Sequence, residues 1–201
     1  MGLALAMLGL GVAGDVCAGQ GLLREGATPE YSPEVQEVLE KKLNLIKALA
    51  QEPTTVANIQ ENLLKNQQLT EREIQRLDKE WTEGREANGL VHQVLGNSCA
   101  RHLWGFQEAH DEFSEIFVTD MRGLVVSSTN RTSDYNQADE AWWVEAFAEG
   151  RGRSYYGEIE YDESARSEAI ALYVPVRDPE SNRVIGVVKA LCDLTAIMME
   201  L

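Results

Sequence analysis

The chain lacks the short motifs that mark common catalytic and phosphate-binding sites. It contains no G-x-S-x-G, no H-E-x-x-H, no phosphate-binding loop and no dinucleotide-binding glycine pattern, and its 16 glycines are spread singly. Nothing in the sequence therefore specifies an enzyme, and we expect neither catalytic residues nor a cofactor.

Positive charge is scarce as well. The chain has 18 Lys and Arg against 33 Asp and Glu, so its formal net charge is −15. A strongly acidic surface repels phosphate backbones and anionic lipids, which excludes nucleic acid and membrane surfaces as expected partners. With 44% hydrophobic and 25% charged residues, the composition is globular, and 201 residues suit one domain or one domain plus a helical extension.

Long apolar runs are absent except at the start. Residues 1–14 carry no charge, but this run is too short to cross a bilayer, which needs about 20 residues. Val16 and Ala18 suit the −3 and −1 positions of a signal-peptidase site. We therefore expect a signal peptide at 1–18, a linker at 19–32, and a periplasmic or secreted protein. No Lys or Arg precedes the apolar run, and a buried N-terminal helix is the alternative.

The histidines that share a helix face are too far apart to bind one metal ion. His92 and His110 would share a helix face with Cys99, but they lie about 27 Å apart at 1.5 Å per helical residue. We therefore expect no metal. Cys99 and Cys192 would remain after export, either paired or as two separate buried thiols.

Helical periodicity dominates residues 33–112. Ser32 suits an N-cap before Pro33, and Thr70 with Glu73 forms a capping-box pair. The helices expected from these signals cover residues 32–51, 54–67, 70–81 and 90–113, with a break near 96–97.

At about Phe113 the apolar period changes from 3.6 to 2, which is typical of strands. Gly123 suits a hairpin turn, and Asp139 could N-cap a short helix at 140–150. The expected strands are 116–119, 124–129, 154–161, 167–176 and 183–194. This order predicts an α+β fold in which long N-terminal helices pack on a five-stranded antiparallel sheet formed by residues 113–201.

The stretch "DYNQADEAWW", residues 134–143, is unusual because polar residues lead directly into two tryptophans. Adjacent helical residues point about 100° apart, so Trp142 and Trp143 can face different surroundings, one of them the core. An aromatic wall beside placed polar groups is typical of a small-molecule pocket.

Four segments, "EIFVTDMRGLVVSSTNRTSDYNQADEAWWVEAF", "EYDESA", "YVPVRD" and "VIGVVKALCDL", together resemble PDC-type Cache domains. These are PAS-like extracytoplasmic sensor modules of bacterial chemoreceptors and sensor kinases. The resemblance covers about residues 98–195 and implies one Cache-like domain.

The resemblance also implies a site. Amino-acid-binding members carry Tyr, four residues, Arg, one residue and Trp-Tyr, followed later by a Tyr and two Asp. Here Glu140 stands at the arginine position, where the family holds a ligand carboxylate. The predicted ligand-binding residues are Tyr135, Glu140, Trp142, Trp143, Tyr161, Asp162 and Asp193.

We therefore expect an extracytoplasmic sensor domain that binds a small molecule, with a signalling partner protein or a homodimer through the N-terminal helices. Acids gathered beside aromatic rings favour an amine ligand, although Arg153, Arg166 or Lys189 could hold an anion. The alternatives are a structural or interaction module, in which the acidic helices of residues 33–110 form a dimer and the pocket is vestigial, and an enzyme.

Overall fold

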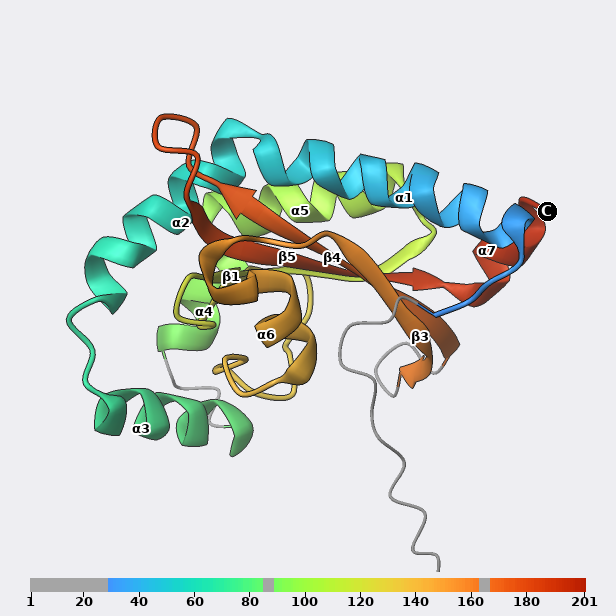
Figure 1. Cartoon of the computed structure of the whole chain (residues 1–201). Coiled ribbons are helices and arrows are strands. Elements are labelled where there is room, and N and C mark those ends of the chain that lie inside the picture. Colours follow the sequence, from blue (N-terminus) through green and yellow to red (C-terminus); the bar gives the residue numbers. More distant parts are fainter. Residues whose placement is uncertain (1–28, 85–88, 163–166) are drawn as a thin grey trace, which may run out of the picture.

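The computed structural model describes residues 29–84, 89–162 and 167–201 (Figure 1). The expected signal peptide and most of the expected linker lie outside these residues. The helices are α1 Pro33–Gln51, α2 Pro53–Asn66, α3 Glu71–Thr82, α4 Gly89–Gly96, α5 Ser98–Ala109, α6 Ala141–Phe147 and α7 Leu194–Met199, with a 3-10 turn η1 Ala148–Gly150. The strands are β1 Phe113–Asp120, β2 Val125–Ser128, β3 Tyr155–Asp162, β4 Ser167–Arg177 and β5 Val184–Asp193.

All strand pairs are antiparallel, and the order across the sheet is β2-β1-β5-β4-β3. Helices α1, α2 and α5 cover one face, and α6 lies on the other (Figure 1). The α+β fold predicted from the sequence is therefore confirmed, including the five-stranded antiparallel sheet and the helix between the second and third strands.

The core between helices and sheet follows from the helical period of α1. Ser32 accepts a hydrogen bond from the backbone N of Val35 and caps the helix. Leu39, Ile46 and Leu49 follow one another at spacings of seven and three residues and are fully buried against the sheet. The outward face of α1 is polar and charged.

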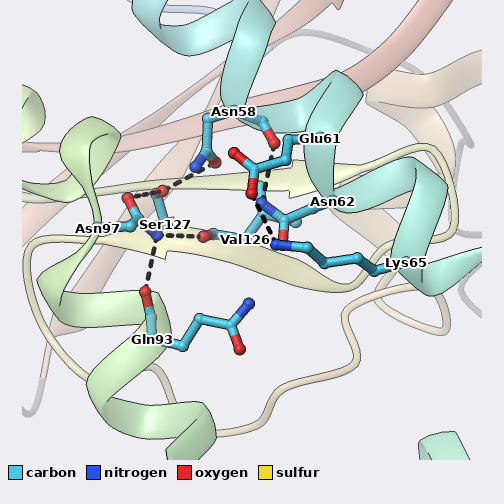
Figure 2. A network of polar contacts seen from close by, with 8 residues as sticks. All are labelled: Asn58, Glu61, Asn62, Lys65, Gln93, Asn97, Val126 and Ser127. Carbon is cyan, nitrogen blue, oxygen red and sulfur yellow. Dashed lines mark hydrogen bonds and ion pairs between the residues drawn. The ribbon is translucent and has the colours of Figure 1, made fainter.

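A buried polar seam fixes the break between α4 and α5 against β2 (Figure 2). Oδ1 of Asn97 accepts from the backbone N of Ala100 (2.8 Å), and its Nδ2 donates to the carbonyl of Val126 (2.8 Å). The Ser127 hydroxyl lies 2.7 Å from Oδ1 of Asn97 and 3.0 Å from Oδ1 of Asn58 on α2. An apolar side chain at position 97 would leave buried backbone groups unpaired, so this asparagine specifies the break.

Lys42 joins three elements of the fold. From α1, its Nζ lies 2.8 Å from Oε1 of Glu112, which precedes β1, and 2.5 Å from Oε1 of Glu200, which follows α7. Burial opposes the charge of Lys42, but hydrogen bonds to both glutamates raise its pKa. Burial likewise opposes the charge of Glu112, yet the bond from Lys42 holds the pKa of that carboxyl below its usual value. The charged cluster therefore ties α7 to α1.

The turn between β1 and β2 is locked by Asp120 and Gly123. The buried carboxylate of Asp120 accepts from the backbone N of Arg122 (2.8 Å) and from Nδ2 of Asn66 at the end of α2 (2.7 Å). Burial raises the pKa of this carboxyl. Gly123 has φ +79°, and a Cβ there would lie 2.6 Å from the backbone N of Ala138. The hairpin glycine predicted from the sequence is therefore required for two reasons: its positive φ favours glycine, and no space is left for a Cβ atom.

One predicted cap is wrong. Asp139 was expected to cap the short helix, but Glu140 occupies the N-cap of α6 and makes no side-chain capping bond. The helix also ends earlier than Gly150, because Ala148 and Glu149 adopt left-handed backbone angles.

Candidate functional site

A cavity of about 450 Å³ lies on the face of the sheet opposite α1. Its floor is formed by β1, β4 and β5, one wall by the loop 131–137, and the other wall by the end of β3. Cavities of this size hold small organic molecules. The lining residues are Glu115, Phe117, Arg131, Thr132, Ser133, Gln137, Glu160, Tyr161, Ala169, Ala171, Lys189 and Leu191.

The hollow follows from small side chains on one face of β4. Side chains alternate along a strand, so Ile170 and Leu172 pack against the helices while Ala169 and Ala171 face the cavity. Two methyl groups leave space where larger side chains would meet the opposite wall. The alternation therefore produces a filled core on one face and an open floor on the other.

Lys189 lies at the centre of this floor. It pairs with Phe117 on β1 and Tyr173 on β4. Its Nζ lies 5.7, 4.9 and 5.9 Å from the ring centroids of Phe117, Trp142 and Tyr173. Aromatic faces attract a cation by about 0.5–2 kcal/mol. The protein's own ammonium therefore occupies the aromatic cluster that an external cation would otherwise use.

Charges of both signs face the cavity. Lys189 and Arg131 supply positive charge, whereas Glu115 and Glu160 supply negative charge. Nη2 of Arg131 is buried and has no hydrogen-bond partner within the described ranges. A buried donor without a partner is unfavourable. Because Nη2 is buried, other atoms of Arg131 form the lining of the cavity.

Two of the residues predicted as ligand-binding lie at or next to this cavity. Tyr161 lines its wall and is 64% exposed. Trp142 stacks on Tyr173, with ring centroids 5.2 Å apart. It does not line the cavity itself but contacts Lys189, which does.

Two other predicted residues lie in the core. Tyr135 is 3% exposed and packs on Trp81, with ring centroids 5.9 Å apart. Trp143 is 7% exposed, and its Nε1 donates to Oγ1 of Thr119 (2.9 Å). The two tryptophans thus face different surroundings, but the space beside Tyr135 is filled.

The predicted acids do not gather around the tryptophans. Glu140 is exposed at the start of α6. Asp193 caps α7, where its Oδ1 accepts from the backbone N of Thr195 (2.7 Å) and Ala196 (3.3 Å). Burial opposes the charge of Asp193, but these and further hydrogen bonds lower its pKa. Asp162 ends β3, and its side chain lies outside the described part.

Sequence reasoning named Lys189 only as a residue that could hold an anion, and it missed the other residues of the cavity floor. Lys189 is the one charged residue between Val184 and Cys192 in an otherwise apolar strand, and such an interruption was a usable signal. The alternation of alanine with large apolar residues at 169–172 was another. Arg131 had no comparable signal, because it stands in a polar loop.

Among the described residues, no group of His, Cys, Asp and Glu could hold a metal ion. Cys99 and Cys192 are buried and unpaired, and burial raises the pKa of both thiols, that of Cys192 to about 12. No helix in the described ranges is long and apolar enough to cross a membrane.

Comparisons with known proteins find a likeness to solved structures alone. No family model and no curated protein matches the chain. The extracellular domain of the histidine kinase vpHK1S-Z8 superimposes with a TM-score of 0.50 at 9% identity, over 82% of this chain and 55% of that one. The sensor domain of DcuS from E. coli superimposes with a TM-score of 0.47 at 16% identity, over 83% of this chain and 96% of that one. The ligand-binding domain of the Pseudomonas aeruginosa chemoreceptor PctC, in complex with GABA, superimposes with a TM-score of 0.44 at 16% sequence identity. The match covers 83% of this chain and 60% of that one.

The chain thus spans little more than half the length of two of these domains. At such identities the likeness is one of fold. The resemblance to a PDC-type Cache sensor domain is confirmed at that level: the protein has the α+β fold of the histidine-kinase extracellular domain.

Proposed function

We propose that this protein is an extracytoplasmic sensor domain that binds a small molecule and does not change it chemically. The observation that carries the proposal is the cavity above Ala169 and Ala171, which has charged groups at its floor and walls. The similar solved domains belong to receptors and kinases, which supports signalling rather than catalysis.

We propose further that the ligand carries both a negative and a positive group. Arg131 and Lys189 suit a carboxylate, and Glu115 and Glu160 suit an amine. The amine that the sequence favours depends on acids that include Asp193, and Asp193 caps α7 instead. In the present proposal an amine binds next to Glu115 or Glu160. It does not bind in the aromatic cluster, which Lys189 already occupies.

A thermal-shift screen tests this function. A compound at about 100 times its dissociation constant stabilises the folded state by about 2.7 kcal/mol. GABA, amino acids, amines and carboxylates form the first library. The matched variant is Ala171→Leu, whose larger side chain fills part of the cavity floor. Compounds with both charges should stabilise the wild type and not the variant. If no compound acts, or if stabilisation survives in the variant, the proposal fails.

A structural module that dimerises through α1 is the alternative. The outward face of α1 carries charged pairs such as Lys41 with Glu37, with Nζ 2.9 Å from Oε1, so a dimer there would rest on polar contacts. Exposed ion pairs contribute little, about 0–1 kcal/mol. Sedimentation at increasing protein concentration separates the two: a stable dimer without ligand binding supports the alternative.

Export is tested separately, because residues 1–18 lie outside the described part. Mass spectrometry of the protein made in a secreting bacterial host should find a mature chain beginning at Gly19. An intact Met1 in a cytoplasmic product would contradict the proposed location.

A further inference from the structure

Helix α3 is attached to the wall of the cavity by its carboxyl-terminal half. Oδ1 of Asp78 accepts hydrogen bonds from two successive backbone groups of the wall loop, the N of Tyr135 (2.8 Å) and the N of Asn136 (2.9 Å). Charge-assisted hydrogen bonds of this kind are stronger than neutral ones. Asp78 therefore fixes the backbone of the loop from outside the cavity.

Trp81 makes the second attachment. Its ring is fully buried, and its Nε1 donates to the carbonyl of Thr132 (2.8 Å), a residue that lines the cavity. The guanidinium carbon of Arg131 lies 5.5 Å from the Trp81 ring centroid. Nη1 of Arg131 lies 3.7 Å from the place where a Cβ on Gly84 would stand. The guanidinium thus packs at the carboxyl-terminal end of α3, where the helix dipole favours a positive charge.

The wall loop is stiff between these attachments. The Thr132 hydroxyl donates to the carbonyl of Asp134 (2.6 Å), and Nε2 of Gln137 donates to the same carbonyl (3.0 Å). A displacement of α3 would therefore carry Arg131, Thr132 and Gln137 together, and all three line the cavity.

We infer that α3 is the positioning element of the cavity wall: Trp81 and Asp78 hold the loop whose Arg131 side chain lines the cavity. The ligand side of this inference rests on the proposed function. Coupling between two sites is reciprocal, so an anion that binds Arg131 also stabilises the docking of α3 on the loop.

Phenylglyoxal labelling tests the positioning without any ligand. This reagent modifies accessible guanidinium groups, and peptide mass spectrometry gives the rate at Arg131 relative to that at exposed Arg183. Trp81→Phe removes the indole donor and keeps a ring, while Asp78→Ala leaves the buried core intact in case the tryptophan variant folds poorly. Asp111→Ala, at an exposed acid outside the cavity, is the matched control.

We expect the relative rate at Arg131 to rise about fivefold or more in both α3 variants, within the usual range of such couplings, and to stay unchanged in the control. An unchanged rate in Asp78→Ala overturns the inference.

Acetate, compared with chloride at equal ionic strength, serves as the anionic probe. It should slow Arg131 labelling in the wild type and not in Asp78→Ala. If acetate fails to slow Arg131 labelling in the wild type while both α3 variants still label fast, that result supports the positioning role and contradicts the anionic part of the proposed ligand. The two failures are therefore distinguishable.

Discussion

Replacing Trp143 by alanine should destabilise the protein more than the same change at Trp142. Trp143 stacks on Phe147, with ring centroids 4.7 Å apart, and its indole N–H is bonded to Thr119 inside the core. Removing a buried Trp usually destabilises by about 3–5 kcal/mol. Trp142 is half-buried, and its loss removes a stacked pair worth about 0.5–1.5 kcal/mol and a cation–π contact worth about 0.5–1 kcal/mol, together about 1–2.5 kcal/mol.

Thermal unfolding followed by far-ultraviolet circular dichroism measures this difference without relying on tryptophan signal. At about 2–4 °C per kcal/mol, Tm should fall by about 6–20 °C for Trp143→Ala and by about 2–10 °C for Trp142→Ala. Trp104, which is 44% exposed on α5, gives the control substitution. Only Trp142→Ala should also weaken ligand binding, because it removes a ring that holds Lys189. Equal losses of stability, or the reverse order, would refute this division of roles.

Gly123→Ala should destabilise by more than about 2 kcal/mol in urea unfolding because of its positive φ and the contact with the 138 backbone; Gly105→Ala, in open space on α5, should stabilise by about 0.5–1 kcal/mol. A similar effect at both glycines would contradict this. Lys42→Met should destabilise by about 1–3 kcal/mol, since it strands two glutamates. The wild type should lose stability as pH falls below about 4.3, because the folded pKa of Glu112 is depressed. If Lys42→Met loses as much stability as the wild type over the same fall in pH, the reasoning fails. The folded pKa of Asp120 is raised above its unfolded value of about 3.9. Its contribution to folding stability is therefore fully present below about pH 3.9 and is lost as pH rises through the folded pKa. Asp120→Asn should lack this slope between pH 3 and pH 7, and an unchanged slope would argue against it.

Much of the fold could be predicted because its physical signals are local. The change of apolar period at Phe113 separates helices from strands, and Gly123 marks a turn that needs a positive φ. The break near Asn97 was visible too, although the reason for it lies in β2, far away in sequence. The end of α6 was not visible, because nothing local requires Ala148 to adopt left-handed angles.

The site was harder to predict, because a motif gives positions along the chain. It does not show which neighbouring backbone N–H groups need a hydrogen-bond acceptor or which distant residues pack nearby. Asp193 matches a binding position, yet it ends β5 and leads directly into α7, whose first N–H groups need an acceptor. Tyr135 faces Trp81, a residue from a helix far upstream that no local pattern connects to the loop. Lys189 was detectable as a charge in an apolar strand, but its aromatic neighbours come from three other elements.

Nuclear magnetic resonance titration of labelled wild-type protein tests the central claim most directly, using the compound that stabilises it most in the thermal screen. The cavity account predicts backbone amide shift changes centred on residues 131–133, 169–171 and 189–191, with little change at 193–197. Shift changes centred instead on residues 193–197, or no saturable change with any compound, would contradict it.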